Sequence, residues 1–203
     1  MEIVNRLRRE GPSLTSFRTV LAEGKGATRE WPDDKDFEKN FCSKAIYNKS
    51  LNSSQIKLIL QLINDQLVTP QTEQITVSNL EIEHIMPQAW YDNYELEGEI
   101  MSKEIIDGWD IFENDDEMAK SDKVEERNNL IHSIGNLTIV TKSLNAAMRN
   151  GPFKGKKKDL RNSILFLNRY FDKIETWDEK EIDRRARWLF AGARKIWAGP
   201  SKE

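Results

Sequence analysis

The sequence predicts a mostly helical α+β fold, in which a small two-stranded sheet and a short helix are surrounded by further helices. Two observations support this prediction. A strand-like stretch lies at 75–85, and a glycine turn followed by a second strand lies at 132–141; this second strand runs directly into a short helical stretch at 142–149. Apolar residues at helical spacing precede the first strand and follow the short helix, as expected for helices that cover a small sheet.

Residues 1–74 are expected to form helices that pack on this core. Short helices are predicted at 13–22 and around Phe37, and a longer one begins after Asn52. Asn52 is a favourable N-cap residue, and Gln55 follows it at the spacing of a capping box. The apolar stripe of this longer helix predicts one buried face. It consists of Ile56, Ile59, Leu60, Ile63 and Leu67.

Residues 75–203 are expected to form one domain, interrupted between the two strands by an acidic insertion at 92–129. Fourteen Asp and Glu face four Lys and Arg in this insertion, so a solvated surface with one or two short helices is expected. The regular calcium-loop pattern is absent from it. A pair of amphipathic helices at 159–197 is predicted to complete the domain.

The composition is that of a globular protein rather than a disordered one, because 38% hydrophobic residues and six tryptophans can build a core. No apolar run approaches the roughly 20 residues that span a bilayer, and the first residues do not form a signal peptide. A cytoplasmic protein without a membrane partner is therefore expected. The single cysteine, Cys42, excludes a disulfide framework and a Cys-rich zinc site.

The net charge of −3 conceals a division of the chain. Residues 142–203 carry sixteen Lys and Arg against eight Asp and Glu, a net charge of +8, so the first 141 residues carry −11. A basic part attached to an acidic part indicates a surface that binds a polyanion.

Glu83 and His84 lie at the end of the first predicted strand, next to Pro87. Because adjacent side chains of a strand point to opposite faces, these two would not hold one ion together. They could instead flank one substrate, with Glu83 holding a metal and His84 acting on a water beside it. On these residues alone, the alternative is an edge strand with two solvated polar side chains. Asn136, which begins the second strand, and Asn145, on the short helix, converge on the same place and favour a site.

Hydrolysis of a phosphodiester bond suits these residue types. The reaction needs an activated water and a cation that stabilises charge on the phosphate and the departing oxygen. His84, with an unperturbed pKa of about 6.5, is suited to accept a proton near neutral pH. Glu83 and Asn145 offer hard oxygen ligands, which favour Mg²⁺ or Mn²⁺ over zinc.

The same residues resemble the HNH, or ββα-metal, nuclease motif. The run from Glu83 to Gln88 is similar to the Asp-His-Ile-x-Pro signature of that motif, and the spacing from Asn136 to Asn145 resembles that in the HNH domains of RNA-guided nucleases. The resemblance implies an antiparallel two-stranded sheet with a short helix, a catalytic His84, and an Asn136 that orients the loop and His84. Two positions depart from the motif: Glu83 stands where many members have Asp, and Asn145 stands where others have a second His.

A longer pattern, over roughly residues 75–197, resembles the C-terminal HNH domain of GmrSD-type modification-dependent restriction enzymes. Beyond the run that begins at Glu83, it comprises Ile134-Gly135-Asn136-Leu137-Thr138, Leu144-Asn145, Asn150, Phe153, Lys157, Trp177, Ile182, Arg185, Leu189 and Trp197. SspE-like nicking nucleases, which respond to phosphorothioated DNA, share the arrangement. The resemblance implies an endonuclease of an anti-phage restriction system that acts on double-stranded, possibly modified DNA. It also implies a nucleotide-hydrolysing partner, either an N-terminal domain or a second chain, since no phosphate loop occurs in these residues.

Basic residues on and after the short helix predict contacts with DNA phosphates, against the alternative of a solvated loop. They are Lys142, Arg149, Lys154, Lys156, Lys157, Lys158 and Arg161. Aromatic residues do not alternate with them, which favours duplex DNA over a single strand. His132 could touch a phosphate, form a local hydrogen bond or serve as another metal ligand, and Asn150 is a possible addition to the site. Arg184, Arg185 and Arg187 fit a DNA contact or an ordinary exposed basic face equally well.

Three functions are compatible with this sequence. The leading interpretation is a metal-dependent DNA endonuclease. The second is a catalytically silent module that keeps the fold and binds DNA or docks on a partner. The third is a nuclease that is active only when joined to its nucleotide-hydrolysing partner.

Overall fold

The computed structural model describes residues 2–11, 13–24, 31–69, 71, 77–107 and 115–199. The described part is mostly helical and carries two small antiparallel sheets, so the predicted α+β class is confirmed. None of its helices is both long enough and apolar enough to cross a membrane.

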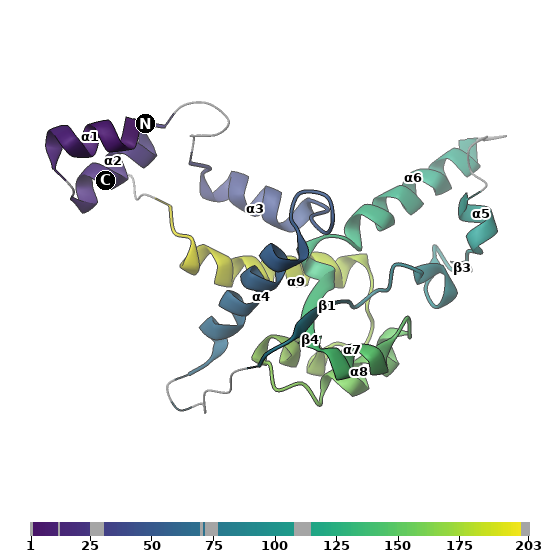
Figure 1. Cartoon of the computed structure of the whole chain (residues 1–203). Coiled ribbons are helices and arrows are strands. Elements are labelled where there is room, and N and C mark those ends of the chain that lie inside the picture. The colour runs from purple at the N-terminus through teal and green to yellow at the C-terminus, as the bar shows by residue number, and fades with distance from the viewer. Residues whose placement is uncertain are drawn as a thin grey trace.

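The sheet at the centre of the fold pairs β1 (Leu80–His84) with β4 (Leu137–Thr141) in antiparallel register. Helix α7 (Lys142–Met148) follows β4 at once and packs on both strands. Its N-cap, Thr141, accepts a hydrogen bond from the Leu144 N–H. The three elements form the expected strand–strand–helix unit (Figure 1).

Strand β1 is shorter than the predicted 75–85. It begins after Asn79, whose φ of 58° lies in the left-handed region and interrupts an extended chain. The predicted start, 75–76, lies outside the described residues.

The main core lies between the sheet and α9 (Glu179–Ile196), onto which α3 (Asp34–Ser43) and α4 (Ser53–Leu67) pack. The predicted capping box of α4 is confirmed, because Asn52 and Gln55 exchange side-chain and backbone hydrogen bonds. Ile56, Leu60 and Ile63 of its stripe are fully buried.

The turn η2 (Ile134–Asn136) leads into β4 and packs closely against α9. A Cβ atom at Gly135 would lie 2.2 Å from the Ile182 carbonyl oxygen. Glycine at this position therefore allows the start of β4 to approach α9. This contact holds the start of β4 against a long helix.

The N-terminal segment contains two parts that differ in their packing. Helices α1 (Glu2–Glu10) and α2 (Leu14–Ala22) pack on each other, and Leu14 and Phe17 remain exposed. Helices α3 and α4 pack on the core. The helix predicted at 13–22 is present with its N-cap at Ser13.

The acidic insertion is more ordered than the sequence suggested. It contains the hairpin β2–β3, helix α5 and the sixteen-residue helix α6, which is longer than the predicted short helices. Their bounds are Glu95–Leu96, Glu99–Ile100, Lys103–Asp107 and Asp115–Leu130. Arg127 near the end of α6 fixes the insertion to the core: its guanidinium lies 4.6 Å from the Trp90 ring and donates to Glu179 and to the Glu95 carbonyl.

The predicted helix pair at 159–197 is present only in its second member, α9. The lysine run forms a helix of its own, α8 (Phe153–Leu160), and a 3₁₀ helix, η3 (Phe166–Lys173), follows it. Asn168 causes the break, because its buried side chain accepts from Thr138 and donates to the Ile139 carbonyl and to Ser163. These bonds attach η3 to β4 rather than letting it continue α8.

Candidate active site

The end of β1 presents Glu83 and His84 to two different environments. They pair with Thr138 and Leu137 of β4, respectively. Alternation along the strand places the two side chains on opposite faces. Both are largely buried, at 8% and 7% exposed, so the alternative of two solvated polar residues does not describe this strand end.

On one face, the Glu83 carboxylate is bound by Lys156 from α8. Lys156 Nζ donates to Glu83 Oε1 at 2.5 Å and to the His84 carbonyl oxygen at 2.6 Å. Burial raises the pKa of Glu83, and the positive charge of Lys156 opposes this shift. Burial also lowers the pKa of Lys156, and the charge of Glu83 opposes that shift. The two groups stabilise each other's charged forms in a site that would otherwise favour the neutral ones.

Lys156 is the predicted DNA contact that the structure places elsewhere. Its side chain is 1% exposed, whereas a phosphate contact must reach solvent. The physical reason is the helical spacing of Phe153, Lys156 and Leu160, which puts all three on the buried face of α8. The spacing is visible in the sequence, where the three residues recur at helical intervals.

On the other face, the His84 ring lies among aromatic rings. His84 Nε2 is 3.4 Å from His132 Nδ1, and the Tyr47 ring meets the His84 ring edge-on with a centroid distance of 4.6 Å. Tyr47 also stacks on His132. Burial, followed by the charges of His132 and Lys156, lowers the pKa of His84 to about 3. The imidazole is therefore neutral at pH 7, and burial makes it a weaker proton acceptor than the unperturbed group expected from the sequence.

Tyr47 was absent from the sequence prediction. It lies in the loop after α3, where no periodicity points to a role. The Ile46 and Tyr47 N–H groups both donate to the His132 carbonyl oxygen. These bonds bring the loop to the His84 face of the strand.

Asn136 fixes the loop that follows β1. Its Oδ1 accepts from the Met86 N–H at 2.8 Å and from Trp177 Nε1 at 2.9 Å, while its Nδ2 donates to the Met86 and Ile131 carbonyls. The Ile85 N–H donates to the Asn136 backbone oxygen at 3.0 Å. The side chain is fully buried with all its donors and acceptors in use, so Asn136 can position neighbours but has no atom left for a ligand.

Asn145, the second predicted metal ligand, lies on α7 and binds a carboxylate of β1. Its Nδ2 donates to Glu81 Oε2 at 2.8 Å. Glu81 is two residues before Glu83 and lies on the same face of β1. The structure thus brings Asn145 to the Glu83 face through Glu81, a residue that the sequence prediction did not include.

The oxygen atoms on this face suit a hard cation. Among the described residues, neither Glu83 Oε2 nor Asn145 Oδ1 takes part in a hydrogen bond. No group of three or more His, Cys, Asp or Glu that could hold a metal occurs in the part of the chain that the structure describes. A closed zinc site is therefore not present there, whereas a sparse oxygen set completed by waters and phosphate is typical of Mg²⁺.

Most of the predicted phosphate contacts form an exposed basic surface on α7 and α8, which pack side by side. Its exposed members are Lys142, Arg149, Lys154, Lys158 and Arg161, and we call this set the α7–α8 basic surface. Lys157 is partly buried and forms an ion pair with Glu175. Asn150 is exposed at the end of α7, and its carbonyl accepts from Asn93.

The arginines of α9 have three different environments. Arg185 is fully buried and donates to the Gly135 and Leu137 carbonyls, so it supports the strand rather than a ligand. Arg184 is bound to Glu181. Arg187 pairs with Glu38 and Asp183.

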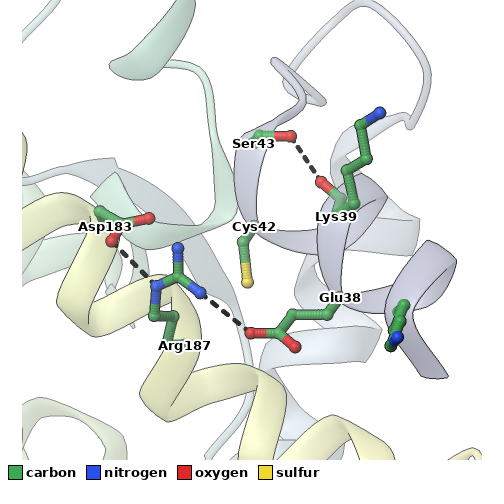
Figure 2. A pocket seen from close by; sticks show the side chains of 7 residues that line it. Glu38, Lys39, Cys42, Ser43, Asp183 and Arg187 are labelled. Carbon is green, nitrogen blue, oxygen red and sulfur yellow. Dashed lines mark hydrogen bonds and ion pairs between the residues drawn. The ribbon is translucent and has the colours of Figure 1, made fainter.

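A pocket of about 310 Å³ lies between α3 and α9, away from the predicted site residues. Figure 2 shows Arg187 extending into it toward Glu38 and Asp183. Burial raises the pKa of Cys42, which also lines the pocket, to about 11, so this thiol is not a nucleophile at neutral pH. The pocket is lined mainly by charged side chains, among which Arg187 pairs with Glu38 and Asp183.

The family model for the C-terminal domain of GmrSD restriction endonucleases matches residues 31–191. The chain belongs to this family. A search of curated proteins and a search of solved structures find no match. The matched region begins at the start of the helices that pack on the core and includes the whole strand–strand–helix unit. At the level of the family, the chain is a nuclease domain of a restriction endonuclease.

Proposed function

We propose that this chain is a metal-dependent HNH endonuclease domain that hydrolyses phosphodiester bonds of double-stranded DNA. The observation that carries the proposal is the end of β1, where a carboxylate with an open oxygen and a neutral imidazole occupy the two faces of one strand. The family membership of the chain supports the same conclusion.

In the proposed mechanism, Glu83 and Asn145 would hold Mg²⁺ or Mn²⁺ through their open oxygens. The ion would stabilise negative charge on the scissile phosphate and on the departing 3′ oxygen. His84 accepts a proton from the attacking water on the opposite side of the strand end. Asn136 keeps the loop after His84 in place, and the α7–α8 basic surface binds phosphates on either side of the scissile bond.

The partners proposed from the family are a duplex that carries a modification and a nucleotide-hydrolysing domain, in the same chain or in a second one. Such a system restricts phage DNA in the cytoplasm. The charge division supports a DNA surface on the C-terminal part, since +8 of formal charge lies in residues 142–203.

A plasmid cleavage assay tests the proposal. Supercoiled DNA should be nicked or linearised by the wild-type protein with Mn²⁺, and chelation of the metal should stop the reaction. Glu83→Gln should remove cleavage, whereas Lys173→Met, at an exposed lysine on η3, should leave it unchanged. A wild-type protein that binds DNA and does not cut it at any Mn²⁺ concentration would refute the endonuclease proposal.

A second candidate is the silent module that binds DNA or docks on a partner. It is favoured by the Lys156 ammonium at Glu83, which already neutralises the carboxylate on which a cation would depend. A gel shift without metal-stimulated cleavage would support this candidate. Cleavage that appears only when the nucleotide-hydrolysing partner is joined would instead identify a nuclease that requires its partner.

A further inference from the structure

Lys156 is a fixed part of the site, and an arriving cation would not displace it from Glu83. Its side chain is 1% exposed, and its ammonium contacts both the Glu83 carboxylate and the His84 carbonyl. An ammonium that left Glu83 would lose the ion pair that it forms there while its stem stayed buried between α8 and β1. Such uncompensated burial of a charge is strongly unfavourable.

The contact of Lys156 with Glu83 leaves one carboxylate oxygen available. Lys156 binds Oε1, and Oε2 accepts no hydrogen bond from the described residues. A hydrogen bond to one oxygen of a carboxylate fixes the direction of the other oxygen. In the same way, the partners of many metal ligands fix the direction of those ligands. The position of a ligand oxygen is therefore defined before any cation arrives.

The local charge, however, is low for a divalent cation. Glu81 and Glu83 carry two negative charges on this face, and Lys156 removes one of them. Mg²⁺ and Mn²⁺ sites of nucleases commonly obtain further negative charge and oxygen ligands from the substrate phosphates. The α7–α8 basic surface lies beside this face and attracts such phosphates.

We propose that Lys156 makes metal binding depend on DNA: it holds Glu83 in the geometry of a ligand and cancels its charge, so that a divalent cation binds tightly only together with a DNA phosphate. This inference rests on the proposed function, since it concerns the same metal site. By thermodynamic linkage, Mn²⁺ must then strengthen DNA binding by the same factor as DNA strengthens Mn²⁺ binding.

The test measures Mn²⁺ affinity calorimetrically, with and without a short duplex oligonucleotide, in a His84→Ala background that keeps the DNA intact. The duplex should increase Mn²⁺ affinity by about 10-fold or more, within the usual range of coupling between two sites. Lys156→Met in the same background should bind Mn²⁺ more tightly without DNA and show a smaller effect of the duplex. Lys173→Met, at an exposed lysine, should match the background protein.

Lys156→Gln serves as a second variant, because the amide can still donate a hydrogen bond if Lys156→Met does not fold. Equal Mn²⁺ affinity with and without the duplex would overturn the inference, as would a Lys156 variant that binds free Mn²⁺ less tightly than its background. Absence of Mn²⁺ binding in every form would overturn it too. If the wild-type protein cleaves DNA and the Mn²⁺ affinity is the same with and without the duplex, the inference is wrong and the proposed function stands. If the duplex raises the Mn²⁺ affinity and the wild-type protein does not cleave DNA, the inference stands and the proposed function is wrong.

Discussion

The two faces of the end of β1 differ in how they control charge. The Glu83 face contains a buried ion pair with Lys156, and the His84 face contains uncharged aromatic rings. Burial alone would favour the neutral form of each group, and it does so for His84, whose pKa falls to about 3. On the other face Lys156 opposes the effect of burial on Glu83, although the pKa of this carboxyl remains raised. One strand end can thus offer a charged ligand and a neutral base only a residue apart.

The largest expected effect comes from Asn136, on which both faces depend. Asn136→Ala removes four buried hydrogen bonds and should lower the free energy of unfolding by about 4 kcal/mol, at roughly 1 kcal/mol for each bond. Urea denaturation measures the change. Asn162→Ala, at an exposed position, is the control. A loss below about 1 kcal/mol would contradict the positioning role of Asn136.

The next largest effect concerns the ion pair on the Glu83 face. Lys156→Met leaves the Glu83 carboxylate buried without its partner and should cost about 3 kcal/mol of stability. The double variant Glu83→Gln with Lys156→Met removes the uncompensated charge and should recover much of that loss. Urea denaturation of the two single variants and the double variant gives the coupling. If the losses of unfolding free energy in the two single variants add up to the loss in the double variant, Glu83 and Lys156 are not energetically coupled.

The pH dependence of stability, compared with that of a variant at His84, examines the His84 face. Between pH 6.5 and 3 the unfolded chain binds a proton at His84 that the folded chain does not, so the free energy of unfolding falls as the pH is lowered through 6.5. The fall amounts to about 2 kcal/mol between pH 6.5 and 5 for this one group. His84→Phe removes it, and the unfolding free energy of that variant should therefore depend less on pH in this window. Parallel curves for the two proteins would refute a buried neutral His84.

The smallest effect concerns DNA binding outside the strand end. Replacing Lys154 and Lys158 together by Met should weaken binding of a duplex by about fivefold and reduce the salt dependence by roughly two counterions. Both lysines are exposed on α8, so stability should not change. A filter-binding titration at several salt concentrations measures both quantities. If the salt dependence of DNA binding did not change, these two residues would not contact DNA phosphates.

The sequence predicted those parts of the fold that depend on local patterns. Alternation along a strand placed Glu83 and His84 on opposite faces, and the capping box at Asn52 defined the start of α4. Both follow from neighbouring residues alone. The strand–strand–helix order was predicted for the same reason, because a strand-like stretch runs directly into a helical one at 142.

The residues that complete the site could not be predicted so directly, because they reach it through tertiary contacts. Tyr47 comes from an irregular loop and meets His84 across thirty-seven positions of the chain. The sequence predicts a surface position for Lys156, since a lysine is almost never fully buried unless it is paired. Its partner Glu83 precedes it by seventy-three residues, and no local pattern reveals such a pair.

The most direct test of the account compares Mn²⁺ binding and DNA cleavage in two variants, one for each face of β1. In the presence of a duplex oligonucleotide, His84→Ala should bind Mn²⁺ as the wild-type protein does and fail to cut, whereas Glu83→Gln should lose both binding and cleavage. This result would assign the ion to one face and the proton transfer to the other. Cleavage by His84→Ala at the wild-type rate, or Mn²⁺ binding by Glu83→Gln at wild-type affinity, would contradict that division of roles.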